Sequence, residues 1–221
     1  MPKRFISHIY ETFGLHLNYS TDHTRRQWQT DLECEITDNV WASVIENTHK
    51  ILCCNIDRER QFKILHRLHC TPWLRGRLGL NLSICIKCNS ETDTYVHMFW
   101  TCAKIQSFWR EVRDEVSSLI GYDCQLSPLQ CVLAARVDSA RNNPNAKLIG
   151  ILLYAARKSI LKLWISKDTP SLDDWYKEVL RILPLERLTY TIHDNVDGFI
   201  KIWQPVLDSV DPSNLNFVLS V

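Results

Sequence analysis

The spacing of four residues in the middle of the chain constrains the fold more than any other sequence feature. Cys85 and Cys88 form a Cys-x2-Cys pair, and His97 and Cys102 follow to give Cys-x2-Cys-x8-His-x4-Cys. Two thiolates on one tight turn can bind the same ion at little extra ordering cost. Three thiolates and one imidazole suit the closed tetrahedral site that zinc favours. The spacing therefore predicts one structural zinc ion, bound by Cys85, Cys88, His97 and Cys102.

The last two ligands require a break in the backbone between them. On one continuous α-helix, positions i and i+5 lie about 140° apart, so their side chains cannot converge on one ion. We therefore expect His97 on a short helix and Cys102 in the turn before a helix that begins near Ala103. Because protein atoms fill all four positions, the ion is expected to stabilise the fold, on the order of 10 kcal/mol at neutral pH, rather than activate water.

The remaining cysteines and the start of the chain bear on the compartment. The cysteine count is nine, an odd number, and Met1–Ile6 lacks the apolar stretch of a signal peptide. Both features predict a reducing intracellular compartment, cytoplasmic, nuclear or both. An alternative leaves Cys85 and Cys88 as core thiols and His97 as a surface or packed histidine. We interpret the other cysteines as buried thiols: Cys34, Cys53, Cys54, Cys70, Cys124 and Cys131. If one of the four assigned ligands is not a ligand, Cys70 is the residue expected to take its place.

The periodicity of the apolar residues predicts an all-α, irregular helical domain with the zinc-binding loop between helices. Apolar residues make up 45% of the chain, enough for a core. The longest apolar run, 148–156, is far shorter than the roughly 20 residues that span a bilayer, so no membrane contact is expected. A helix is predicted from an N-cap near Thr37-Asp38, and a second over 57–69, with Phe62, Leu65 and Leu68 facing inward and its end before Pro72. Further helices are predicted from Ala103 to a Gly121 cap, over 146–165, from Ser171 to a break at Pro184, and over 197–207.

This pattern suggests three regions. Residues 1–30 form a polar and partly flexible segment, with a loop over 19–26. Residues 31–120 combine helices with the zinc module, and residues 121–221 form a C-terminal helical region packed on it. Trp100, Phe108 and Trp109 follow the apolar stripe of the helix after Cys102, so we interpret them as core residues rather than base-stacking platforms.

The order of motifs around the zinc ligands resembles a known family. The motifs are Phe62–His69 (FKILHRLH), Thr71-Pro72, the ligand set itself, Asp93–Trp109 (DTYVHMFWTCAKIQSFW), Ala155–Lys158 with Trp164, and Leu183–Arg187. They are similar to the zinc-binding C-terminal segment of LINE-type (non-LTR) retrotransposon reverse transcriptases, over about residues 27–205. In that family the segment follows a polymerase core, in a polypeptide that also carries an endonuclease. The resemblance implies binding of template RNA or target DNA, with the polymerase domain of the parent element as a partner. One departure is Ala103, where such sequences often have proline.

Basic residues near the zinc motif make nucleic acid the expected partner. The net charge is only +1, so binding must come from a local patch. Such a patch would contact phosphates without much sequence specificity. The alternative is an ordinary solvated helix face, which is also the stronger interpretation for Arg157, Lys158, Lys162 and Lys167. The candidate phosphate contacts are Arg60, Lys63, Arg67, Arg75, Arg77, Lys87 and Lys104.

No catalytic constellation is recognised. Polymerases of this family need a Tyr/Phe-x-Asp-Asp box to hold catalytic metal ions. The only Asp-Asp pair is Asp173-Asp174, which we interpret as the cap of the helix that begins after Ser171. The expected function is therefore a non-catalytic, zinc-stabilised nucleic-acid-binding module. Two alternatives stay open: a helical protein-interaction or scaffold domain, and a translated retroelement remnant that binds no nucleic acid.

Overall fold

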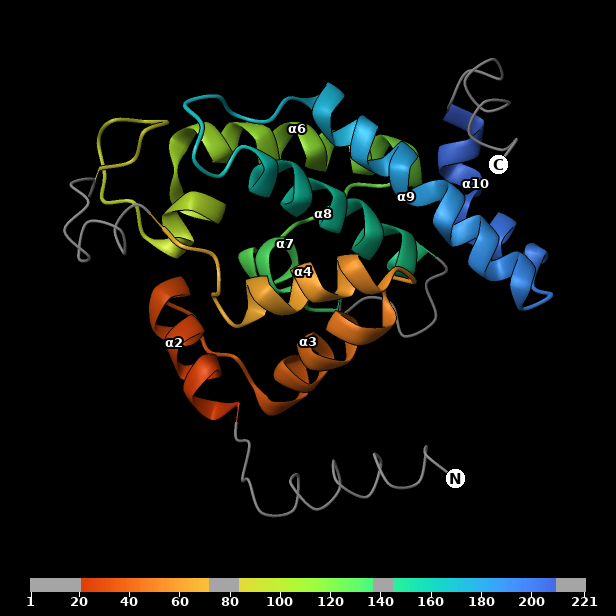
Figure 1. Ribbon diagram of the computed structural model, residues 1–221, viewed down its shortest axis with the longest axis horizontal. Coiled ribbons are helices and arrows are strands. Elements are labelled where there is room, and N and C mark those ends of the chain that lie inside the picture. The colour runs from red at the N-terminus through yellow and green to blue at the C-terminus, as the bar shows by residue number, and fades with distance from the viewer. Residues whose placement is uncertain (1–20, 72–83, 137–144, 210–221) are drawn as a thin grey trace. The chain divides into compact units, whose positions relative to one another are not determined.

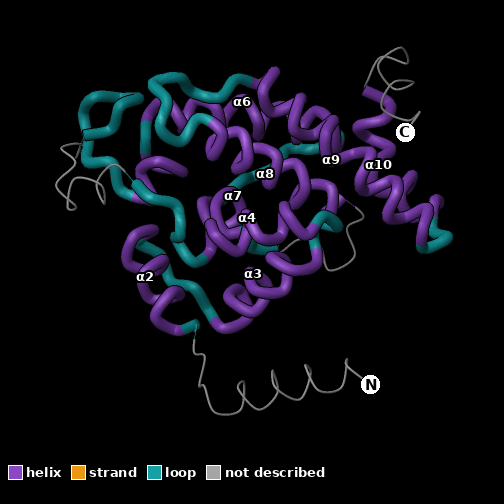
Figure 2. Tube along the Cα trace, in the orientation of Figure 1, coloured by secondary structure: helices purple, strands orange, loops and turns teal. Residues whose placement is uncertain are grey.

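The computed structural model describes residues 21–71, 84–136 and 145–209 (Figure 1). The chain divides into two compact units, Met1–Ile36 and Thr37–Val221. In the described residues the regular structure is helical, and the only strand-like pairing there is an isolated bridge between Ile84 and Thr92 (Figure 2). The all-α prediction is confirmed. The predicted divisions near residues 30 and 120 stay predictions.

The described part of the first unit is one helix and its C-terminal turn. Helix α2 spans Asp22–Leu32 and ends at Glu33, whose backbone is left-handed. The loop predicted over 19–26 is therefore wrong from Asp22 onward, and residues 19 and 20 lie outside the described ranges. Asp22 in the first turn favours the positive end of the helix dipole. The Arg25 Nε group donates to the Ile36 carbonyl at 2.7 Å, which fixes the segment after the helix.

The second unit begins with a helix that the sequence predicted well. Helix α3 spans Asp38–Lys50, and the Thr37 hydroxyl accepts from the Val40 N–H as its N-cap. Trp41, Val44 and Thr48 are buried. The prediction of a helix capped at Thr37-Asp38 is confirmed.

The next helix differs from its prediction in length and in its buried face. Helix α4 spans Asn55–Leu65 and not 57–69. It ends because Arg67 adopts a left-handed backbone, with φ of 57°, and the Leu68 N–H donates to the Lys63 carbonyl. Phe62 and Leu68 were expected to face inward but are 41% and 60% exposed. The buried face instead contains the polar residues Asp57 and Gln61 beside Ile64 and Leu65.

Helices α6 and α7 follow the cysteine motif. Helix α6 spans Ala103–Ile120 and ends at Gly121, whose φ of 78° needs the conformational freedom of glycine, as predicted. Phe108 and Trp109 are buried, and Trp100 is half-buried. Helix α7, Pro128–Leu133, was not predicted, although it begins with a Ser127/Gln130 capping box.

The C-terminal half contains three longer helices. Helix α8 spans Asn145–Lys162, α9 spans Leu172–Ile192 and α10 spans Val196–Ser209. The Ser171/Asp174 capping box of α9 is confirmed. The predicted break at Pro184 is wrong, because α9 continues through it. The buried residues Ile182, Leu183 and Glu186 hold this turn in place, which offsets the missing N–H of the proline.

Helix α8 lies at the centre of the second unit. It packs against α9, α6, α7 and α10, and residues 151–157 are all buried (Figure 1). Within the described ranges, none of the helices is both long and apolar enough to cross a bilayer. The metal-binding segment joins this core through an aromatic cluster in which Tyr95 and Phe99 contact Trp164.

Candidate metal centre

The first two ligands lie on a tight turn that is closed by the antiparallel bridge between Ile84 and Thr92. The Cys85 N–H donates to the Glu91 carbonyl at 2.8 Å, and the Asn89 N–H donates to the Cys85 carbonyl at 2.7 Å. Asn89 closes the turn with a φ of 55°, which asparagine tolerates better than most residues. These hydrogen bonds fix the backbone of the turn that carries both cysteine side chains.

A single π-helical turn presents the other two ligands. Residues His97–Thr101 form this turn, and the Cys102 N–H donates to the His97 carbonyl at 3.1 Å. This i to i+5 hydrogen bond brings Cys102 back over His97, which a regular α-helix cannot do. Cys102 then has an extended ψ of 124°, and α6 begins at Ala103. The predicted break between His97 and Cys102 is confirmed, and the π turn is the device that produces it.

The four ligand atoms form a set of the size that one metal ion requires. All four lie within 4.8 Å of one another. The Cys85 and Cys102 sulfurs are 3.9 Å apart, and the Cys88 sulfur is 3.4 Å from His97 Nε2. In a tetrahedral zinc site with Zn–S bonds of about 2.3 Å and Zn–N bonds of about 2.0 Å, these separations are about 3.8 and 3.5 Å. Cys85, Cys88, His97 and Cys102 can therefore hold one metal ion in a closed site.

The neighbours of His97 set its tautomer. His97 Nδ1 lies 3.1 Å from a carboxylate oxygen of Glu91 and 3.2 Å from the Thr101 hydroxyl. A carboxylate only accepts, so Nδ1 carries the proton and Nε2 keeps its lone pair for the metal. This carboxylate–histidine arrangement is typical of metal-ligating histidines. Neither Glu91 nor Thr101 was identified from the sequence, although both lie within six residues of His97.

The surroundings of the two cysteines of the turn shift their pKa values in opposite directions. Burial raises the pKa of Cys85 to about 12, against hydrogen bonds from the backbone N–H groups of Cys88 and Lys87. Burial also acts to raise the pKa of Cys88, but hydrogen bonds from the Ser90 side chain and from the backbone N–H groups of Ser90 and Glu91 prevail and lower it to about 6. A divalent ion at the centre would favour the thiolate form of all three cysteine ligands.

Lys87 has a structural position that its sequence context did not predict. It is only 8% exposed, and its Nζ donates to three backbone carbonyls just after α8: Leu163 at 2.6 Å, Ser166 at 2.6 Å and Asp168 at 3.1 Å. An ammonium group has three donors, and all are used here. The prediction that Lys87 contacts phosphate is corrected for this reason. Lys87 instead joins the metal-binding turn to the end of α8.

The other predicted phosphate contacts differ in their surroundings. Arg60 and Lys63 are half-exposed on α4 and pair with Asp57 and Glu59. Arg67 lies 5.3 Å from the centre of the Tyr95 ring, and Lys104 is exposed at the start of α6. Arg75 and Arg77 lie outside the described residues.

The remaining cysteines are not brought to the metal site. Cys124 and Cys131 are buried as predicted, but Cys34, Cys53 and Cys54 are half-buried. Cys70 is exposed, so the buried-thiol prediction is wrong for it. It is not a member of the metal-binding set, which is complete without it.

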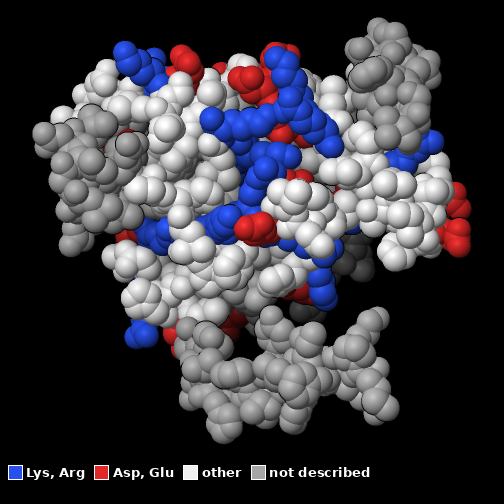
Figure 3. All heavy atoms as spheres, in the orientation of Figure 1, with Lys and Arg blue, Asp and Glu red and all other residues white. Residues whose placement is uncertain are grey.

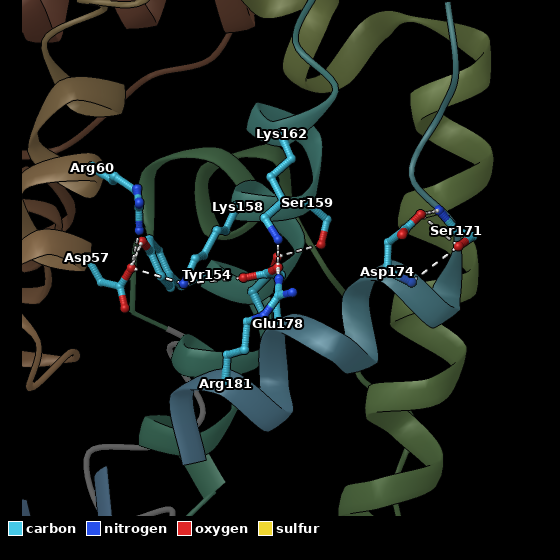
Figure 4. A network of polar contacts seen from close by, with 11 residues as sticks. Asp57, Arg60, Tyr154, Lys158, Ser159, Lys162, Ser171, Asp174, Glu178 and Arg181 are labelled. Carbon is cyan, nitrogen blue, oxygen red and sulfur yellow. Dashed lines mark hydrogen bonds and ion pairs between the residues drawn. The ribbon is translucent and has the colours of Figure 1, made fainter. Parts of the chain in front are cut away.

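A second polar cluster lies between α4, α8 and α9 (Figure 4). The Glu178 carboxylate is buried and is shared by Lys158 at 3.3 Å, by Lys162 and by Arg181. Lys158 also lies 3.2 Å from the buried Asp57, which pairs with Arg60 at 2.8 Å and accepts from the Tyr154 hydroxyl at 2.7 Å. We call Arg60, Lys158, Lys162 and Arg181 the cationic band.

The cationic band carries more charge than its carboxylates neutralise. It contains four cations and two carboxylates, Asp57 and Glu178, whose side chains are only 4% and 1% exposed. The side chains of Arg60, Lys162 and Arg181 are 42%, 48% and 58% exposed. Figure 3 shows the result as a run of Lys and Arg atoms across the face over α4, α8 and α9. Sequence reasoning assigned Lys158 and Lys162 to a solvated face and did not consider Arg181.

No protein-family model matches this sequence. The resemblance to the LINE-type reverse transcriptase segment therefore stays a prediction that depends on motif order. Over the ranges that the structure describes, the fold is all-helical, with four residues between helices that can bind a metal ion.

Proposed function

We propose that the chain is a non-catalytic, zinc-stabilised nucleic-acid-binding module related to the C-terminal segment of LINE-type reverse transcriptases. The observation that carries the proposal is the cationic band, in which two buried carboxylates lie beside four cations, three of them with exposed side chains. Although the net charge of the chain is only +1, this surface presents local positive charge to solvent. Contact with a phosphate backbone requires such a local patch. Phosphate contacts of this kind give affinity with little sequence specificity.

Zinc is the ion that we assign to the metal site. Three thiolates and an imidazole form a soft ligand set that disfavours magnesium and calcium. The ligand separations suit tetrahedral zinc, and the Glu91 contact to His97 gives the outer-shell support that such sites use. Lys87 would transmit this order to the end of α8, the helix that supplies Lys158 and Lys162.

The first test is a fluorescence-anisotropy titration of labelled single-stranded RNA and of duplex DNA with the zinc-loaded protein. At two salt concentrations, the slope of log affinity against log salt reports the number of phosphate contacts, at about 0.7 per contact for single strands and 0.9 for duplex DNA. The double variant Lys162→Gln/Arg181→Gln should weaken binding and reduce the slope by one to two contacts. Lys201→Gln, an exposed lysine on α10, is the matched control. No binding even at low salt would refute the proposal for this chain.

A second candidate is supported by a different surface. Five large apolar residues on consecutive turns at the end of α9 and the start of α10 are 42–69% exposed: Leu185, Leu188, Ile192, Val196 and Ile200. Leu185, Leu188 and Ile192 follow helical spacing, so they share one face of α9. An exposed apolar face of this kind is typical of protein-interaction surfaces. It favours the scaffold alternative.

Light scattering coupled to size-exclusion chromatography separates the two candidates. If the apolar face drives association, the protein should form oligomers that Leu188→Lys/Ile192→Lys converts to monomers. A monomer at all concentrations that still binds RNA favours the nucleic-acid module. Because Leu188 and Ile192 are exposed, these changes should leave the thermal midpoint within a few degrees.

A further inference from the structure

A cavity of about 420 Å³ lies where two helices begin and two end. Helices α4 and α8 begin at it with Arg58 and Lys147, whereas α3 and α9 end at it with Lys50 and Tyr190 (Figure 1). Two helix N-termini and two helix C-termini lie at this cavity, so helix dipoles of both signs act on it. The side chains therefore decide which ligand the cavity favours. Its volume is within the range of small-molecule sites.

The lining is basic and contains no carboxylate among the described residues. Lys50, Arg58, Lys147 and His193 contribute basic groups, and Thr189 and Tyr190 contribute hydroxyls. Cys53 adds no negative charge, because burial raises the pKa of its thiol to about 11. The cavity is thus built from hydrogen-bond donors and positive charge.

Two of the three permanent cations have carboxylate partners outside the lining. Lys50 pairs with the exposed Glu46 at 2.9 Å, and Lys147 lies 3.4 Å from the buried Glu186. Burial acts to lower the pKa of Lys147, but Glu186 and the Tyr190 hydroxyl outweigh it and raise the pKa, so Lys147 stays charged. Its Nζ donates to Tyr190 at 2.9 Å, which anchors the ammonium group at the wall.

Arg58 is the cation without a carboxylate partner among the described residues. Its Nε donates to the Leu52 carbonyl at 2.5 Å, and its Nη1 donates to Asn55 Oδ1 at 3.4 Å. These bonds fix the plane of the guanidinium and leave further N–H groups for a ligand. A fixed guanidinium can contact two phosphate oxygens at once, and the two ammonium groups in the same lining add point charges.

We propose that this cavity binds a phosphate monoester, carried by a small molecule such as a nucleoside monophosphate or by the 5′ end of a polynucleotide. Arg58 contacts two phosphate oxygens, the ammonium groups of Lys147 and Lys50 donate further hydrogen bonds to the phosphate, and the hydroxyls of Thr189 and Tyr190 contact the attached sugar or alcohol. The site is separate from the cationic band and does not depend on whether the chain binds a nucleic-acid backbone.

Isothermal titration calorimetry with inorganic phosphate, AMP and adenosine tests this site. AMP and phosphate should bind saturably, and adenosine, which lacks the phosphate, should not. Arg58→Gln should weaken AMP binding about tenfold or more, as expected when a charge-assisted hydrogen bond is lost. Arg110→Gln, an exposed arginine on α6, is the control and should bind as the unmodified protein does.

A variant with an exposed side chain keeps the test decisive if Arg58→Gln fails to fold. Lys50→Glu changes a side chain that is 73% exposed, so it should fold normally and still weaken AMP binding. Equal binding of adenosine and AMP, no saturable binding of AMP, or unchanged affinity in folded Arg58→Gln or Lys50→Glu protein would each overturn the proposal. Competition then identifies the source: displacement of AMP by a 5′-phosphorylated but not by a 5′-hydroxyl oligonucleotide assigns the site to a polynucleotide end, and displacement by neither assigns it to a small molecule.

Discussion

Replacing Lys87 by methionine tests the link between the metal-binding turn and the end of α8. Methionine keeps most of the aliphatic stem and removes the ammonium group. The substitution deprives the Leu163, Ser166 and Asp168 carbonyls of their shared donor. We expect Lys87→Met to destabilise the fold and to accelerate metal loss, while the affinity of the folded protein for nucleic acid stays unchanged.

The size of the effect follows from the three hydrogen bonds. Each bond to a charged donor contributes about 1.5–3 kcal/mol, so three give an upper bound of about 4.5–9 kcal/mol. Removing the ammonium group also removes its own burial cost of several kcal/mol, and the freed carbonyls of Ser166 and Asp168 can meet water because Asp168 is exposed and Ser166 is only half-buried. A net loss of about 2–4 kcal/mol remains. For a chain of 221 residues this lowers the thermal midpoint by about 4–16 °C.

Two readouts and one matched variant make the result interpretable. Circular dichroism in excess zinc gives the midpoint, and a chromogenic chelator gives the rate of zinc release. Lys104→Met changes an exposed lysine one residue beyond the last metal ligand, and it should shift the midpoint by less than about 2 °C. If Lys87→Met melted like the unmodified protein but bound RNA with a shallower salt slope, Lys87 would be a phosphate contact and the structural assignment would be refuted.

Three further predictions address the metal and the buried polar groups. Cys88→Ser should lose the bound zinc and Cys70→Ser should retain it, as measured by elemental mass spectrometry. Glu178→Gln should cost about 2–3 kcal/mol at neutral pH, since three cations lose their shared carboxylate. Burial acts to raise the Glu178 pKa, but the cations outweigh it and lower the pKa in the folded protein. The ionised carboxylate therefore stabilises the fold above its ordinary pKa of 4.5, and this stabilisation is lost as pH falls through the lower folded pKa. Chemical unfolding should show a smaller difference in stability between Glu178→Gln and the unmodified protein at pH 3 than at pH 7. Arg157→Met should lower the free energy of unfolding by about 2–4 kcal/mol. The double variant Arg157→Met/Gln61→Leu should lose less stability than the two single variants added together, because the two buried side chains are hydrogen-bonded to each other at 2.9 Å.

Features set by short-range geometry could be predicted from the sequence. The caps at Thr37, Ser171 and Gly121 depend on residues within a few positions, and each is where the sequence placed it. The metal ligands share this property, because a Cys-x-x-Cys turn and a forced break before Cys102 are local requirements. What the sequence could not supply is the form of the break, a π turn, since several backbone solutions satisfy the same spacing.

Predictions failed where distant polar residues replace the expected apolar ones. On α4, the sequence favoured Phe62 and Leu68 as core residues because apolar side chains normally face inward. Asp57 and Gln61 occupy that face because Tyr154 and Arg157, almost a hundred residues away, hydrogen-bond to them there. The same holds at Pro184, where Glu186 accepts from the Cys53 N–H at 3.0 Å and helps keep the helix intact. Partners this far apart leave no periodic signal.

The buried polar groups are best understood as devices that fix the position of α8. An apolar helix surrounded by other helices can rotate or slide by one residue at little cost, since most of its faces are apolar. Along α8, Lys147 pairs with Glu186 near the first turn, Arg157 bonds to Gln61 in the middle, and Lys87 holds the segment after the last turn. Each contact joins α8 to a different part of the second unit, so only one register satisfies all three. Because Lys87 lies between two of the metal ligands, we infer that the metal centre maintains this third contact. Loss of the metal would then first loosen the C-terminal end of α8, which carries Lys158 and Lys162 of the cationic band.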